Sequence, residues 1–183
     1  NFNKEWFEKE MILPYREVLK KYKIVETESG NQVLFDDANN PNIIIPSGNK
    51  EERKRIYALA NDLFPTKLPL EKYASSWALF AWKECGLFEI EDLCKYVSEQ
   101  VNASQLPSYE WLNHFLTFIE ETDETLLKKH SLVPNNYGIL ISLEEQDFSE
   151  GVGLTESMLD TLLCLGLDLK PKLLNPNITA INF

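Results

Sequence analysis

Residues 107–122 read PSYEWLNHFLTFIEET, and this stretch decides the class of fold. Pro107-Ser108 is typical of a helix start, because proline suits the first helical turn. The apolar residues that follow recur at helical spacing and form one wide face, made of Trp111, Leu112, Phe115, Phe118 and Ile119. The stretch therefore predicts a long amphipathic helix whose aromatic face packs against other helices.

Apolar residues at the same spacing predict helices along much of the remaining chain. Before residue 107 we expect two helices separated near Pro14, one begun by Asn49 with Glu52 and ended by Pro65, one from Pro69 to the cap Gly86, and one along Ile90, Leu93, Cys94, Val97 and Val101. After it we expect a short helix capped by Thr122 and a last helix begun by Thr155, with Met158, Leu159, Leu162, Leu163 and Leu165, ended by Gly166.

A short β region is predicted near the start of the chain. Ile24–Thr27 and Gln32–Phe35 flank the loop Glu28–Asn31, in which Gly30 is free to adopt a left-handed conformation. Ile43–Ile45 is typical of a short buried strand, which Pro46 ends. We therefore predict an α+β, predominantly helical fold, with an antiparallel hairpin or three-strand patch near residues 23–45 and a short strand near residues 138–143.

The chain of 183 residues is 44% hydrophobic, which suffices for one real core. We expect two subdomains within one compact unit. Residues 1–66 form an N-terminal α/β part with helix, hairpin and helix, and residues 67–183 form a helical part with one short strand. The first residue is Asn and not Met, so we expect a segment excised from a larger protein.

The net charge of −11 disfavours nucleic-acid binding, which needs a clustered positive field. The one dense basic stretch contains Lys50, Arg53, Lys54 and Arg55 and also two glutamates. We interpret it as a solvated helix face, and a phosphate-facing edge is the alternative. Three cysteines without close spacing indicate a reducing compartment. No apolar stretch approaches the ~20 residues that cross a membrane, so we expect a cytoplasmic protein without a membrane partner.

Motifs for catalysis, cofactors and metals are missing from the sequence. Gly48-Asn49-Lys50 lacks the glycine frame of a phosphate loop, and Gly151-Val152-Gly153 lacks the third glycine of a dinucleotide motif. No Gly-x-Ser-x-Gly elbow marks a nucleophile. Zinc-ligand spacing is also missing among the candidate ligands, which are Cys85, Cys94, Cys164, His114 and His130. We therefore assign no catalytic, cofactor-binding or metal-ligating residue, and we expect that this segment is not an enzyme.

Several segments, read together, resemble one family. They are Trp6-Phe7-Glu8 with Ile12-Leu13-Pro14-Tyr15-Arg16, Ile24-Val25-Glu26-Thr27 before Gly30, Ile45-Pro46-Ser47-Gly48, Leu63-Phe64-Pro65-Thr66-Lys67-Leu68-Pro69, Trp111-Leu112-Asn113, and Val133-Pro134-Asn135-Asn136-Tyr137-Gly138. In this order they resemble the region after the ATPase domain in bacterial sacsin-like proteins, whose ATPase is of the ninety-kilodalton heat-shock chaperone type. The family usually reads Pro-Asn-Gln-Asn-Gly in the last segment, and this chain departs from it at Asn136-Tyr137.

The resemblance implies a non-catalytic interaction or transduction module, whose partner is an ATPase domain of the same parent chain and whose ATP is bound outside this segment. In the related chaperones a middle-region arginine reaches the γ-phosphate. Arg16 or the Arg53–Arg55 cluster is the candidate here, but no local motif matches and no site is assigned. The alternatives are a stand-alone helical adaptor that binds a protein through an aromatic groove near Trp82, and an enzyme of unknown class.

Overall fold

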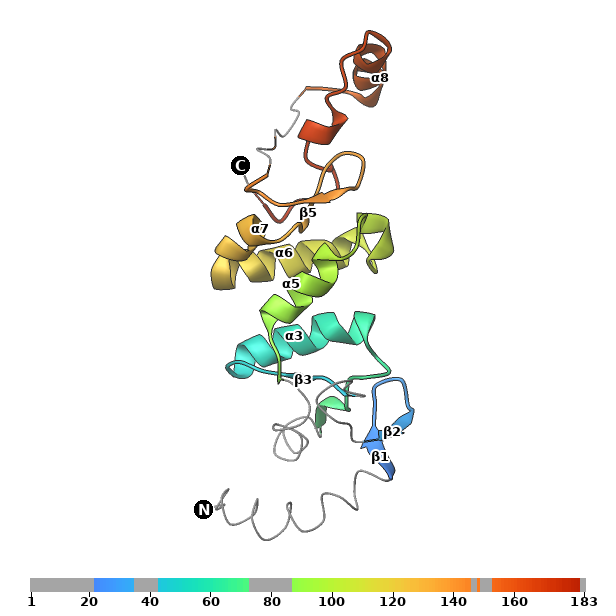
Figure 1. The fold of residues 1–183 in the computed structure, drawn as a ribbon, viewed down its shortest axis with the longest axis vertical. Helices are drawn as coiled ribbons and strands as arrows, with labels where there is room; N and C mark the ends of the chain where they lie inside the picture. Colours follow the sequence, from blue (N-terminus) through green and yellow to red (C-terminus); the bar gives the residue numbers. More distant parts are fainter. Residues whose placement is uncertain (1–21, 35–42, 73–86, 146–147, 149–152, 182–183) are drawn as a thin grey trace. The chain divides into compact units, whose positions relative to one another are not determined.

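The computed structural model describes residues 22–34, 43–72, 87–145, 148 and 153–181 (Figure 1). Helices with small strand pairs make up the described residues, so the predicted α+β, mostly helical class is confirmed. Contacts divide the chain into unit 1 (Asn1–Glu89) and unit 2 (Ile90–Phe183). The predicted boundary between the two subdomains was between residues 66 and 67, whereas the observed one follows Glu89. A parallel strand pair joins residues 45–46 to residues 87–88, which keeps both strands in unit 1.

Unit 1 contains the predicted hairpin. Its strands, β1 (Lys23–Glu26) and β2 (Gln32–Leu34), pair antiparallel. The loop between them includes Gly30, whose φ of 78° lies in the left-handed region that glycine adopts without strain. The fully buried Thr27 closes the loop, because its Oγ1 donates to the Asn31 carbonyl at 3.1 Å.

The hairpin is joined to the chain that follows helix α3 (Lys50–Leu63). The Glu28 N–H donates to the Leu68 carbonyl at 2.9 Å, and the Leu70 N–H donates to the Glu26 carbonyl at 3.1 Å. These bonds pair backbone groups that the edge of a two-stranded hairpin leaves open. The hairpin is therefore tied to α3 through the segment that ends this helix.

The third strand, predicted over Ile43–Ile45, is β3 (Ile45–Pro46), which includes the proline expected to end it. Its partner also differs from the expected patch with the hairpin. It pairs in parallel with β4 (Leu87–Phe88), with Ile45 opposite Leu87. A parallel pair needs a long crossover, so local sequence signals do not indicate it. The Phe88 ring also packs edge-to-face on Phe64, with ring centroids 5.9 Å apart.

Helix α3 begins with the predicted capping pair. The Asn49 Oδ1 atom accepts hydrogen bonds from the N–H groups of Glu51 and Glu52, at 2.9 and 3.0 Å. The Glu52 carboxylate accepts the Asn49 N–H at 2.9 Å, which completes a capping box. Gly48 precedes the cap with a φ of 106°, and a Cβ atom there would lie 2.4 Å from Glu52 Oε2. The cap therefore requires glycine at this position.

Unit 2 is built around the stretch from residue 107 to residue 122. Its elements are α5 (Ile90–Ser98), η2 (Ala103–Gln105), α6 (Tyr109–Asp123), α7 (Thr125–Lys129), β5 (Val133–Pro134), β6 (Leu140–Ile141), α8 (Glu156–Cys164) and η3 (Lys170–Lys172). Ser108 caps α6 by accepting the Trp111 N–H at 3.0 Å. All five residues of the predicted apolar face of α6 are buried, so this helix is confirmed as the core of the unit. Strand β6 confirms the short strand predicted near residues 138–143.

Two predicted helix details in unit 2 are wrong. Helix α5 ends at Ser98, so Val101 lies beyond it and is 71% exposed. Thr122 lies inside α6 and does not cap α7. The N-cap of α7 is Glu124, whose side chain makes no capping bond, and the Asp123 Oδ1 accepts the Thr125 N–H at 3.1 Å. Both errors come from helix ends that are set by the turn geometry and not by the apolar pattern.

Asparagine side chains hold the irregular segments of unit 2 together. Asn135 is buried, and its Oδ1 accepts the N–H groups of Tyr137 and Ile139, at 2.9 and 3.0 Å. Asn175 Nδ2 donates to the Asn135 carbonyl at 3.3 Å. On α6, Asn113 Oδ1 accepts two N–H groups and its Nδ2 donates to one carbonyl in the last segment, at Thr179, Ala180 and Asn177.

Several predictions lie outside the described residues. They are the two helices near Pro14, most of the helix from Pro69 to Gly86 with Trp82 and Cys85, the candidate Arg16, and Gly151.

We predict that Gly48→Ala destabilises the protein by about 1–3 kcal/mol, because alanine is strained at a φ of 106° and its Cβ collides with Glu52. Gly30→Ala is the matched control, since its φ of 78° is also positive but no atom lies within 4 Å of the added Cβ. Urea unfolding should show the larger loss for Gly48→Ala. Equal losses would mean that the cap does not select glycine.

We predict that Asn113→Ala lowers the free energy of unfolding by about 1–2 kcal/mol, because three hydrogen bonds to the last segment are lost and water replaces them partly. The exposed neighbour His114 supplies the control, and His114→Ala should stay within about 0.5 kcal/mol of wild type. Hydrogen exchange should also speed up at Thr179 and Ala180. Unchanged exchange there would contradict the role of Asn113.

Candidate functional site

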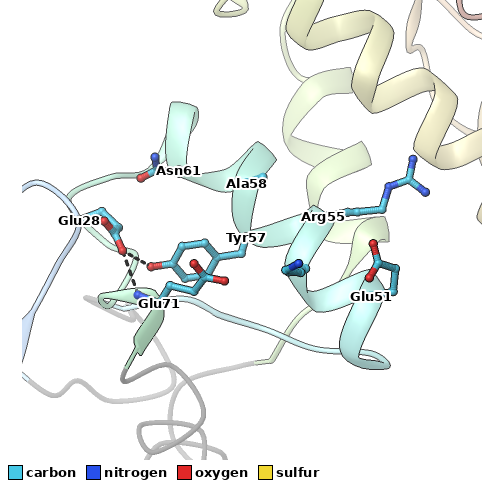
Figure 2. A pocket seen from close by; sticks show the side chains of 8 residues that line it. Glu28, Glu51, Arg55, Tyr57, Ala58, Asn61 and Glu71 are labelled. Carbon is cyan, nitrogen blue, oxygen red and sulfur yellow. Dashed lines mark hydrogen bonds between the residues drawn. The ribbon is translucent and has the colours of Figure 1, made fainter.

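A pocket of about 500 Å³ lies beside α3 in unit 1 (Figure 2). Its described lining combines carboxylates, cations and an aromatic ring, from Glu28, Glu51, Lys54, Arg55, Tyr57, Ala58, Asn61 and Glu71. Residues 51, 54, 55, 58 and 61 recur every three or four positions, so they share one face of the helix. Glu28 from the hairpin loop and Glu71 complete the pocket.

Tyr57 and Glu28 form the best-defined contact in this pocket. The buried Tyr57 hydroxyl contacts both the Glu28 carboxylate and the Pro69 carbonyl, and it has one proton to donate between them. The Glu71 N–H donates to Glu28 Oε1 at 2.9 Å. Figure 2 shows the hydroxyl directed at the Glu28 carboxylate. Glu28 therefore joins the hairpin loop to both α3 and the chain after it.

The environment of Tyr57 keeps its hydroxyl protonated. Burial raises the pKa of Tyr57 far above its ordinary value, and the hydrogen bond to Glu28 and the charges of Glu28 and Glu71 raise it further. A phenol with a raised pKa is a poor base and a poor nucleophile at neutral pH. The Tyr57 hydroxyl therefore acts as a hydrogen-bond donor at neutral pH.

Asn61 gives the pocket an open hydrogen-bonding position. Its Oδ1 atom is buried and has no hydrogen-bond partner within the described part of the chain. A buried acceptor of this kind is able to receive a hydrogen bond from a donor that enters the pocket.

A second pocket of about 470 Å³ adjoins the first, and the two share Lys54, Tyr57 and Glu71. Its described lining has an apolar part and a cationic part, from Ile45, Pro46, Ser47, Gly48, Lys50, Arg53, Lys54, Tyr57, Glu71 and Leu87. Three cations of the basic stretch are exposed, as expected for a solvated helix face, and they also line this pocket. The alternative of a phosphate-facing edge stays open.

Helix α8 in unit 2 carries a different candidate site. Of the five apolar residues predicted for this helix, Leu159 is buried and Leu162 is half-buried. We name as the α8 apolar surface four exposed residues with their exposed fractions: Met158 (49%), Leu163 (43%), Leu165 (78%) and Leu167 (50%). Clusters of exposed large apolar side chains mark interaction sites more often than single ones do.

Hydrogen bonds at the end of α8 fix this surface. The Gly166 N–H donates to the Leu163 carbonyl, and the Leu167 N–H donates to the Leu162 carbonyl, both at 2.9 Å. With a φ of 85° at Gly166, these bonds form a Schellman motif. The predicted helix end at Gly166 is confirmed, and so is the Thr155 cap, which accepts the Met158 N–H at 3.3 Å.

The described residues considered for chemistry differ in burial and in their neighbours. Burial raises the pKa of the Cys94 thiol to about 12, which makes it unreactive, while Cys164 is exposed. His114 is exposed on α6. His130 lies 4.0 Å from the Glu91 carboxylate, and desolvation lowers its pKa. Among the described residues, no group of three metal-ligating side chains occurs.

The sequence did not indicate the Tyr57–Glu28 contact that shapes the pocket in unit 1. Tyr57 and Glu28 lie 29 positions apart, and no local motif links them.

None of the described helices is long and apolar enough to span a membrane.

Comparisons with protein-family models, with curated proteins and with solved structures find no match to this chain.

We predict that Tyr57→Phe lowers the free energy of unfolding by about 1–2 kcal/mol at neutral pH, because Glu28 loses a buried donor. Above pH 10.0 the unfolded chain releases the Tyr57 proton while the folded protein holds it, so wild-type stability falls as the pH rises. The variant lacks this loss. Urea titrations should therefore show the difference between the two proteins shrinking above pH 10.0.

Tyr137→Phe is the matched control, because the Tyr137 hydroxyl also donates to a carboxylate, that of Asp168 at 3.0 Å, but the residue is 44% exposed. Its effect at neutral pH should stay within about 0.5 kcal/mol. A Tyr57→Phe loss no larger than that of the control would contradict a stabilising role for the Tyr57–Glu28 contact.

Proposed function

We propose that this chain is a non-catalytic interaction or transduction module of a larger, cytoplasmic, sacsin-like protein with a chaperone-type ATPase. Its partner in this proposal is a protein, namely the ATPase domain of the same parent chain. ATP binds to that domain and not to this segment. The resemblance of the quoted sequence segments supports the link to this family.

The exposure of the α8 apolar surface is the observation that carries the proposal of an interaction module. Leu165 and Leu167 are 78% and 50% exposed, although burial of a leucine side chain gains about 1.5–3 kcal/mol. A partner that covers them recovers this free energy. The Schellman motif holds both backbones in place, so little chain entropy is lost when a partner binds.

The alternative is a stand-alone adaptor with an aromatic groove. Trp111, Phe115 and Phe118 are buried, and the rings of Trp111 and Phe115 stack 5.3 Å apart. These aromatic residues belong to the core of unit 2. The groove expected near Trp82 lies outside the described residues. We favour the module because the α8 apolar surface is exposed.

We predict that deletion of residues 1–183 from the parent protein changes its ATPase rate or nucleotide affinity by at least about fivefold, as expected for coupled sites. Leu165→Ser with Leu167→Ser in the full parent should reproduce part of this change. Val101→Ser, which alters a 71% exposed valine beyond the end of α5, is the control. An unchanged rate and affinity after deletion would refute the transduction role, as would the lack of an ATPase domain in the same open reading frame.

A further inference from the structure

We propose that the α8 apolar surface binds a basic amphipathic helix of a partner protein. This inference rests on the proposed function, since it names the chemistry of the partner that the module binds. Three observations lead to it: the exposed apolar side chains, the charge of unit 2, and the way its cations are already paired.

Apolar residues recur along α8 at helical spacing. Met158, Leu162 and Leu165 follow one another at spacings of four and three, so they form one stripe along α8 that continues at its end into Leu167. A stripe of this kind packs against a second helix with apolar residues at the same spacing. Leu159 and Leu163, four positions apart, share the adjoining face, on which Leu159 is buried and anchors α8 to its own unit.

The net charge differs strongly between the two units. Unit 2 has 15 Asp and Glu against 5 Lys and Arg, a net charge of −10, whereas unit 1 has 14 against 13, a net charge of −1. Nearly all the net charge of the protein therefore lies in the unit that exposes the apolar surface. A strongly negative unit attracts a basic partner and repels an acidic one.

The cations of unit 2 do little to offset this charge, because three of the five are bound to carboxylates. Lys95 and Lys129 pair with Glu91. Lys170, close to α8, lies 3.0 Å from both Glu156 and Asp160, and these hydrogen bonds raise its pKa, so it stays charged and engaged. On α8 itself, one ammonium group thus faces two carboxylates, so the helix together with Lys170 keeps a net negative charge.

The same charge argues against other occupants. A second copy of the chain would bring two units of charge −10 together. An anionic membrane would meet the same repulsion. A partner helix with lysine or arginine beside its leucines satisfies both the apolar and the electrostatic requirement.

The test uses the full chain and a fluorescent peptide of about 14 residues, four helical turns, with leucine and lysine in an amphipathic pattern. Fluorescence anisotropy should show binding that weakens at least about tenfold in the variant Leu165→Ser with Leu167→Ser. Raising the salt from about 0.05 M to about 0.3 M should also weaken binding, because screening shortens the range of the attraction. Val101→Ser, at a 71% exposed position beyond α5, should bind as wild type does, and unchanged Tm values should show that both variants fold.

Two further peptides separate the two requirements. A leucine and glutamate peptide keeps the apolar stripe and reverses the charge, and a serine and lysine peptide keeps the charge and removes the stripe. We expect both to bind at least about tenfold more weakly than the leucine and lysine peptide. Equal binding of the glutamate peptide, or wild-type affinity in the serine variant, would overturn the inference.

Sedimentation of the chain alone and its binding to phosphatidylserine vesicles test the other occupants. A dimer, or vesicle binding, that disappears in the serine variant would also overturn the inference. The ATPase assay of the parent protein is independent of these results. If the peptides fail while deletion of the segment still changes the ATPase rate, the partner chemistry is wrong and the module stands; the reverse outcome refutes transduction and keeps the docking surface.

Discussion

The contact between Asn135 and Asn175 is the constraint on which the arrangement of unit 2 depends. Asn135 folds its own turn by binding two N–H groups, and its carbonyl accepts the Asn175 side chain. The Asn136 N–H donates to the Leu173 carbonyl at 2.8 Å, so the turn and the segment after η3 lie side by side. Both asparagines are nearly fully buried, and loss of either would leave polar groups without partners.

The position of α8 follows from this contact. The chain between α8 and Asn175 makes further contacts. Lys170 pairs with Glu156 and Asp160 of α8, and Asp168 accepts a hydrogen bond from the Tyr137 hydroxyl. Ion pairs on one side of α8 and the buried Leu159 therefore hold the helix to its unit. The leucines at its end are exposed. These contacts hold α8 while Leu165 and Leu167 stay 78% and 50% exposed.

Local sequence signals predicted the parts of the fold that are satisfied within a few residues. The capping box at Asn49, the Thr155 cap and the loop glycine Gly30 are of this kind. The partner of β3 and the Tyr57–Glu28 contact join distant positions, so spacing alone did not reveal them. The apolar pattern of α8 was read correctly, but a pattern says which side chains are apolar and not whether the same chain covers them.

This distinction bears on what kind of protein the chain is. The pocket in unit 1 holds a protonated tyrosine, and burial raises the pKa of the Cys94 thiol in unit 2. Unit 2 combines an exposed apolar helix with a net charge of −10. Apolar area supplies affinity, and charge supplies selectivity and rapid association. The two features together give a surface that favours one class of partner, which is what an interaction module requires.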